Sequence, residues 1–202
     1  SAVTLCRDMF GVEAEHVLDP TLLLSQDDYA ALLSEKQRQA PGGHLLTYVL
    51  DATPDKQEVV SRLAAALAIE PRTASGQPFA SADPLKAKGG DQTVEGWLTS
   101  FRNAAFVVTD SFHGVAFSII FNKPFLAYGN AERGLARFQS LLGAVGLQHR
   151  IVTGAEEVNL KRLLAPVDWR GVNRRVKALR TRSLRFLTKA LAGVHDRHGA
   201  VG

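Results

Sequence analysis

A polar hexapeptide, residues 109–114, lies between two strongly apolar runs in "VVTDSFHGVAFSIIFNKPF". It places a carboxylate, a hydroxyl and an imidazole within four residues, at Asp110, Ser111 and His113. The preceding run has the length of a buried strand, and the following run has a helical pattern. In open parallel sheets, ligands bind beyond the carboxyl ends of the strands, where the next helix begins. The hexapeptide is therefore the first candidate site.

The chemistry of this turn suits an anion. We expect the side chain of Asp110 or Ser111 to cap the following helix, whose first N–H groups then point outward with the positive end of the helix dipole. His113 in the first turn can donate a hydrogen bond to phosphate or carboxylate, or move a proton near neutral pH. Gly114 leaves space for a close ligand. The competing interpretation is a capped helix with a histidine satisfied in the core.

A second candidate segment, "GNAERGLAR", follows the next expected strand and begins a helix at the same edge. Arg133 and Arg137 are spaced i,i+4 and share a helix face, and Asn130 precedes them. Two guanidinium groups on one face suit phosphate or carboxylate, although a solvated charged face fits equally well. Of the other acids at strand ends, Asp19 is expected in an Asx turn, and Asp51 fits a turn or a site residue.

The elements that must position these residues alternate along the chain. Near-continuous apolar runs at 45–50 and 105–108 indicate strands covered on both faces. Strands alternating with helices predict an α/β, Rossmann-like three-layer fold with a mainly parallel sheet. Residues 73–92 have the composition of a long loop or lid. The expected strands cover 14–20, 44–51, 105–110 and 123–128, with another near 69, and the expected helices cover 3–10, 25–37, 56–69, 93–104, 111–122, 132–146 and 167–193.

The composition is that of a globular protein, because 46% of the 202 residues are hydrophobic and 22% are charged. No segment approaches the roughly 18 to 20 uninterrupted apolar residues of a membrane span. Cys6 is the only cysteine, so no internal disulfide can form and a cytosolic setting is the default. No set of residues with metal-ligand spacing occurs, so no metal site is predicted.

The end of the chain is strongly basic. Residues 170–202 carry nine Lys or Arg and one acid, which gives +8 there and leaves −4 on the rest of a chain whose net charge is +4. We predict two parts, a Rossmann-like domain at 1–165 and a basic helix at 166–202 that packs on it or extends from it. The helix has an apolar stripe at Val172, Val176, Leu179, Phe186 and Ala190.

Two interpretations fit that helix. The stripe packs on the domain and the bases are solvated, or the bases are attracted to anionic lipid or to a lipid-phosphate-linked glycan. The second interpretation adds a peripheral position at the inner membrane face. Nucleic acid is not expected as a partner, because no aromatic platform or known binding module accompanies the charge.

The paired central motifs, "VVTDSFHGVAFSIIFNKPF" and "GNAERGLARFQSLL", closely resemble the polysaccharide pyruvyl transferase family, and "FGVEAEHVLDPTLLL" is similar to its segment before the central strands. The resemblance extends over about residues 1–150. It implies transfer of a pyruvyl group from phosphoenolpyruvate, the donor substrate, to sugar hydroxyls in exopolysaccharide or cell-surface glycan biosynthesis, with no cofactor. It also implies one lobe, the C-terminal half, of a two-lobed fold similar to GT-B glycosyltransferases, so an N-terminal lobe would be missing.

The resemblance further implies that His113 is catalytic and lies beside phosphoenolpyruvate. Many members have Arg-Leu-His where this chain has Ser111-Phe112-His113. Either Arg133 or Arg137 compensates for the missing arginine, the donor differs, or activity is lost. The alternatives in function are a glycosyltransferase with a nucleotide-sugar donor and a non-catalytic domain that binds an anion or a sugar. The predicted substrate-binding residues, from the two helix starts described above, are Asp110, Ser111, Gly114, Asn130, Arg133 and Arg137.

Overall fold

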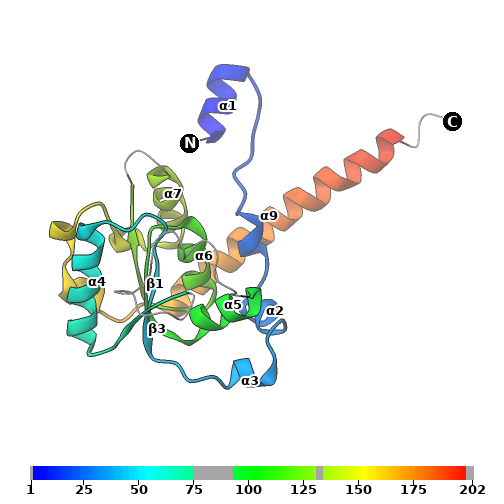
Figure 1. The fold of residues 1–202 in the computed structure, drawn as a ribbon. Helices are drawn as coiled ribbons and strands as arrows, with labels where there is room; N and C mark the ends of the chain where they lie inside the picture. The colour runs from blue at the N-terminus through cyan, green and yellow to red at the C-terminus, as the bar shows by residue number, and fades with distance from the viewer. Residues whose placement is uncertain (1, 75–92, 131–133, 199–202) are drawn as a thin grey trace. The chain divides into compact units, whose positions relative to one another are not determined.

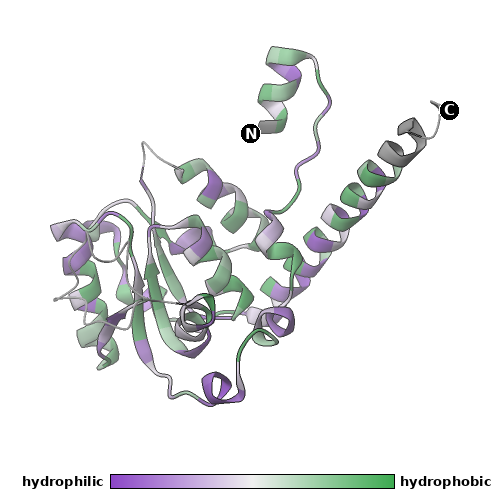
Figure 2. Cartoon of the chain, turned by 45° about the vertical axis from the view of Figure 1, so that its right-hand side comes forward, coloured by the Kyte–Doolittle hydropathy of each residue, from purple (hydrophilic) through white to green (hydrophobic). Residues whose placement is uncertain are grey.

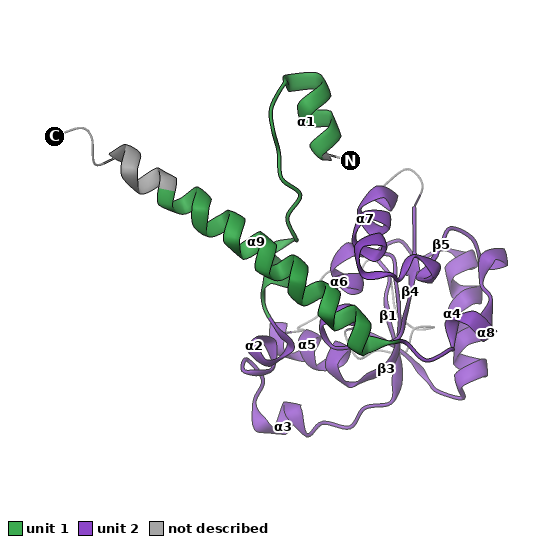
Figure 3. Ribbon diagram, turned by 180° about the vertical axis from the view of Figure 1, so that it is seen from behind, with its two compact units in different colours: residues 1–24, 168–202 green, residues 25–167 purple. Residues whose placement is uncertain are grey.

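The fold is described from a computed structural model, which describes residues 2–74, 93–130 and 134–198. Most of the loop predicted at 73–92 therefore lies outside the described residues. The chain divides into two compact units (Figure 3). One combines residues 1–24 with 168–202, and the other consists of residues 25–167.

The larger unit is built on a five-stranded sheet in the order β2-β1-β3-β4-β5, in which every neighbouring pair is parallel (Figure 1). The strands are mostly apolar (Figure 2), as strands covered on both faces must be. The predicted α/β, Rossmann-like three-layer fold is therefore confirmed. The strands are β1 (His44–Tyr48), β2 (Pro71–Thr73), β3 (Ala104–Thr109), β4 (Phe125–Tyr128) and β5 (Ile151–Val152).

Helices cover both faces of this sheet. On one face, α4 packs Val59 and Leu63 against Phe106 of β3 and Leu126 of β4. On the other face, the Tyr48 ring lies 5.7 Å from that of Phe101 in α5. The helices of this unit are α2 (Gln26–Ala30), α3 (Glu35–Arg38), α4 (Pro54–Leu67), α5 (Val94–Asn103), α6 (Phe112–Ile120), α7 (Leu135–Val145) and α8 (Leu160–Leu163), with the short 3-10 helices η3 (Gln148–Arg150) and η4 (Ala155–Glu157).

The helix boundaries follow local sequence signals. Thr53 caps α4 by accepting a hydrogen bond from the Lys56 amide, and Pro54 occupies the first helical position. Thr93 caps α5 in the same way. Gly146 ends α7 with a φ of 80°, a left-handed conformation that glycine adopts readily. These caps explain why the helices at 56–69, 93–104 and 132–146 were predicted close to their observed bounds.

Two expectations near the N-terminus are wrong, and one strand at the sheet edge was missed. Residues 14–20 form no strand, because Asp19 accepts a hydrogen bond from the Thr21 amide and caps the 3-10 helix η1 (Pro20–Leu23). The single helix expected at 25–37 is two, α2 and α3, since Ser25 and Ser34 each form a capping box. Strand β5 was not predicted, because two residues carry no periodic pattern.

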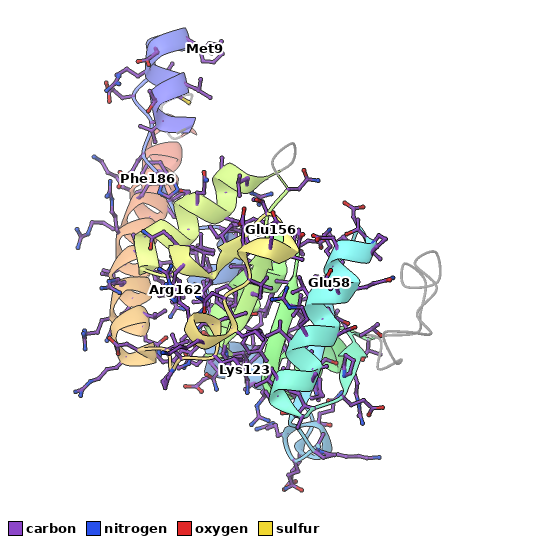
Figure 4. The ribbon with its side chains drawn as sticks, turned by 90° about the vertical axis from the view of Figure 1, so that its left-hand side faces the viewer. Met9, Glu58, Lys123, Glu156, Arg162 and Phe186 are labelled. Atoms are coloured by element: carbon purple, nitrogen blue, oxygen red, sulfur yellow. The ribbon has the colours of Figure 1, made fainter. Side chains whose placement is uncertain are left out.

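The smaller unit contains α1 (Ala2–Phe10), η1 and the long helix α9 (Trp169–His198). Arg180 of α9 donates to the carbonyls of Leu22 and Leu24. The predicted stripe of α9 is buried only in its first half, at Val172 and Val176, whereas Phe186 is 40% exposed (Figure 4). The predicted attraction of this helix to anionic lipid stays a prediction.

Candidate functional site

The hexapeptide forms the junction between β3 and α6 (Figure 1), at the carboxyl edge of the sheet. Ser111 is the N-cap residue, with the extended backbone angles φ −99° and ψ 136°. The first hydrogen bond of the helix runs from the Val115 amide to the Ser111 carbonyl, at 3.1 Å. Within the described part of the chain, no group accepts from the amides of residues 112, 113 and 114. The junction is thus the open, electropositive start of a nine-residue helix.

The prediction that a side chain caps α6 is wrong. Neither Asp110 nor Ser111 accepts a hydrogen bond from the first turn of α6. The Ser111 side chain is instead hydrogen-bonded to the side chain of Tyr48, at the end of the neighbouring strand β1. Because no side chain in the described ranges accepts from the first-turn amides, these amides suit an anionic ligand.

Asp110 is turned to the α4 side of the sheet. Its carboxylate accepts from the Leu50 amide at 2.7 Å and from the Asp51 amide at 3.1 Å. It also pairs with the Lys56 ammonium at 2.7 Å, and the two side chains are only 6% and 9% exposed. Both carboxylate oxygens are therefore bound by protein donors. This geometry points to Asp110 holding the site together, and its predicted contact with substrate stays a prediction.

Gly114 is required by the packing of α6 on β3. A Cβ atom at this position would overlap the Thr109 side chain, 2.8 Å from its Cβ. The hydroxyl of Thr109 is itself fixed, since it donates to the Tyr48 carbonyl at 2.7 Å and accepts from the Ser111 amide at 3.0 Å. The space beside Gly114 is thus filled by Thr109 and not left for a ligand.

His113 is exposed in the first turn of α6, which excludes the interpretation that it is a satisfied core histidine. Its ring centroid lies 5.9 Å from that of Phe112, with the two planes nearly perpendicular. The imidazole is therefore accessible to a ligand at the helix start.

Arg137 joins the same site from α7. Its guanidinium carbon lies 4.3 Å from the centroid of the Phe112 ring, within the range of a cation–π contact. Asn130 forms an isolated bridge with Gly134, the N-cap residue of α7. Arg133 lies outside the described residues, so its predicted pairing with Arg137 is untested. Among the predicted residues, the structure brings Ser111, His113 and Arg137 to one helix start.

Tyr48 and Lys56 were missed by sequence reasoning. Burial, followed by the negative charge of Asp110, raises the pKa of the Tyr48 hydroxyl, while its hydrogen bond with Ser111 acts in the opposite direction. One signal was available for Lys56, because a lysine in the first turn after a buried strand faces the ends of the neighbouring parallel strands. No local pattern, however, pairs it with an acid 54 residues away.

In the described ranges, no group of three or more His, Cys, Asp or Glu residues could hold a metal ion. Nor does any helix in those ranges have both the length and the apolar character needed to cross a membrane. A family model described as polysaccharide pyruvyl transferase matches residues 5–132, a range that includes the whole β3–α6 junction and Asn130. No curated protein and no solved structure gives a significant match to the chain.

Proposed function

The chain belongs to the polysaccharide pyruvyl transferase family, and from this premise we propose that it transfers a pyruvyl group from phosphoenolpyruvate to hydroxyls of a sugar or of a lipid-linked glycan. The observation that carries this proposal is the open start of α6. Three amides there have no protein acceptor in the described chain, and they lie together with the exposed His113 and the Arg137 guanidinium.

Phosphoenolpyruvate makes demands that this arrangement can meet. It carries a phosphate and a carboxylate on one central carbon, so it needs several N–H donors and cations around a small volume. A helix start supplies amides and a positive potential. A guanidinium adds a planar pair of donors that matches either anion. The imidazole of His113 supplies a group that can donate or accept a proton.

The proposed reaction balances without an oxidant or a metal. A proton adds to the methylene carbon of phosphoenolpyruvate, and the central carbon becomes an electrophile. One sugar hydroxyl adds to that carbon and loses its proton, the C–O bond to phosphate breaks, and a second hydroxyl adds and loses its proton. The products are a cyclic ketal and inorganic phosphate. We assign the proton transfer to His113, and the binding of the phosphate and carboxylate to the α6 amides and Arg137.

Arg137 can also replace the arginine that this chain lacks in its version of the Arg-Leu-His turn. Ser111 cannot supply a cation, and its hydroxyl is engaged by Tyr48. The contact between Arg137 and Phe112 brings a guanidinium to the same turn from α7. This supports donor binding by a different arginine, placed by tertiary structure.

Calorimetric titration tests the choice of donor. Phosphoenolpyruvate should bind to the chain, and the His113→Ala and Arg137→Ala variants should each bind it more weakly by about tenfold or more. UDP- and GDP-sugars serve as the comparison. Binding of a nucleotide sugar but not of phosphoenolpyruvate would favour the glycosyltransferase alternative.

Turnover is tested by phosphorus NMR with phosphoenolpyruvate and a panel of sugar acceptors. Inorganic phosphate should appear only when an acceptor is present, and it should not appear with the His113→Ala variant. Phosphate release at the normal rate by that variant would refute the role assigned to His113. Binding of phosphoenolpyruvate without phosphate release from any acceptor would indicate a binding domain.

A further inference from the structure

A buried ion pair lies directly behind the proposed anion site. The Lys56 ammonium of α4 and the Asp110 carboxylate are 2.7 Å apart, and both side chains are more than 90% buried. Burying two charges costs several kcal/mol for each ion, and their attraction offsets this cost only when further hydrogen bonds complete the site. The proposed chemistry uses neither residue as a reacting group, so the pair needs another explanation.

The pair is completed by the backbone of the turn after β1. The carboxylate accepts from the amides of Leu50 and Asp51, and the Lys56 ammonium donates to the Asp51 carbonyl at 2.7 Å. The ammonium also lies 5.4 Å from the centroid of the Tyr128 ring, at the end of β4. These contacts join the carboxyl ends of β1, β3 and β4 to α4.

The position of the carboxylate creates an electrostatic problem that Lys56 solves. Asp110 immediately precedes Ser111, the N-cap residue of α6. An uncompensated carboxylate there would repel the anion that the α6 amides attract, since charges separated by a few ångströms interact strongly away from water. With Lys56 in place, the pair is neutral and the positive potential of the helix start is preserved.

We propose that Lys56 is a charge-compensating and positioning residue of the anion site: it cancels the charge of Asp110 behind the start of α6 and fixes the turn at Leu50–Asp51 against it. This inference rests on the proposed function, because it takes the ligand of the α6 start to be a small dianion or trianion of the phosphoenolpyruvate type. It does not require that phosphoenolpyruvate itself be the donor.

The test separates charge compensation from a purely structural role. Both Lys56→Met and Asp110→Asn break the pair and should lower stability. Only charge compensation makes their effects on anion affinity opposite in sign. Lys56→Met leaves the carboxylate uncompensated and should weaken anion binding about tenfold. Asp110→Asn removes the negative charge and should strengthen binding, by up to about tenfold.

The measurement is calorimetric titration of the chain with inorganic phosphate and, separately, with phosphoenolpyruvate, at low and at high salt. Lys36→Met and Asp27→Asn are the matched controls, because they change the net charge by the same amount at exposed positions and should leave affinity nearly unchanged. If Lys56→Met does not fold, Asp110→Asn and the uncharged double variant Lys56→Met/Asp110→Asn decide the question. The double variant should bind about as tightly as the parent.

The outcomes distinguish this inference from the proposed function. Opposite changes in affinity support the inference, even if the parent chain binds only inorganic phosphate and the assignment of phosphoenolpyruvate fails. If both single variants lose affinity in proportion to their loss of stability, the inference is overturned. Binding of phosphoenolpyruvate by the parent chain would still support it as the donor. If only Asp110→Asn folds, weaker binding by that variant overturns the inference. A parent chain that binds neither anion overturns both.

Discussion

The guanidinium carbon of Arg137 lies 4.3 Å from the centre of the Phe112 ring, which places a cation from α7 beside the first residue of α6. The two residues come from different helices, and each follows the carboxyl end of a central strand. The Phe112 ring lies against one side of the guanidinium, at the distance of a cation–π contact.

The contact between Arg137 and Phe112 predicts a specific loss of affinity for phosphoenolpyruvate. Arg137→Ala should weaken phosphoenolpyruvate binding about tenfold or more, and Arg137→Lys should recover only part of it, since an ammonium cannot make the bidentate, stacked contact. Arg162→Ala is the control, because it removes an exposed arginine elsewhere in the same unit. Equal losses in the Arg137 and Arg162 variants would show that only general charge matters.

Gly114→Ala should destabilise the fold by about 1–3 kcal/mol, because the new methyl group would overlap Thr109 in a close helix–strand contact. Gly143→Ala is the matched control within a helix. Its Cβ would meet nothing closer than the Gln148 side-chain amide at 3.7 Å, and it should stabilise by about 0.5–1 kcal/mol. Thermal unfolding of the two variants measures both effects. A stable Gly114→Ala chain would contradict the tight packing at this junction.

The Lys56–Asp110 pair should dominate the stability of the site. Removing either partner leaves a buried charge unpaired and should cost about 3–5 kcal/mol, whereas the double variant should lose less than the sum of the single losses. Glu58→Gln on the exposed side of α4 (Figure 4) is the comparison. Its pair with Arg62 is 3.6 Å long and largely solvated, and should be worth at most about 0.5 kcal/mol. Additive single losses in denaturant unfolding would argue against a coupled pair.

Stability should fall as the pH drops below about 6.5. Burial lowers the pKa of His149, and the positive charges of Arg150 and Arg162 lower it further. Burial also lowers the pKa of His44, assisted by Arg72 and Lys123 and opposed by a hydrogen bond to the Ser100 backbone.

The sign follows from linkage. A histidine with a lowered pKa binds its proton more readily in the unfolded chain, so acid favours unfolding from the ordinary histidine pKa of 6.5 downward. Denaturant titrations at pH 7.5 and 5.5 should show a smaller free energy of unfolding at the lower pH, and a smaller difference for His149→Gln and His44→Gln. If both variants show the same difference in unfolding free energy between the two pH values as the parent chain, these histidines do not cause the acid destabilisation.

The sequence was sufficient to predict the elements that carry the site, for reasons local to each segment. Residues 104–108 are apolar at every position, as is typical of a strand covered on both faces. Pro124 stops the helix that starts after Ser111, and Gly146 ends the next one. Each signal lies within a few residues of the boundary that it sets.

The interactions within the site could not be predicted in the same way, because they are long-range. Asp110 fits a helix cap by sequence, but Lys56 and the turn at Leu50–Asp51 bind it across more than 50 residues of chain. The segment before Asp19 was also mispredicted, because strand formation depends on a pairing partner elsewhere in the chain. The apolar run before it resembles a strand, but no neighbouring strand pairs with it in the described chain.

The central claim is that the first amides of α6 bind the donor, and two-dimensional ¹H–¹⁵N NMR tests it most directly. Titration of the labelled chain with phosphoenolpyruvate should shift the backbone amide signals of Phe112, His113 and Gly114 in a saturable way, and Arg137→Ala should weaken that response. Saturable binding that leaves these three amides unmoved and shifts signals elsewhere would contradict the claim.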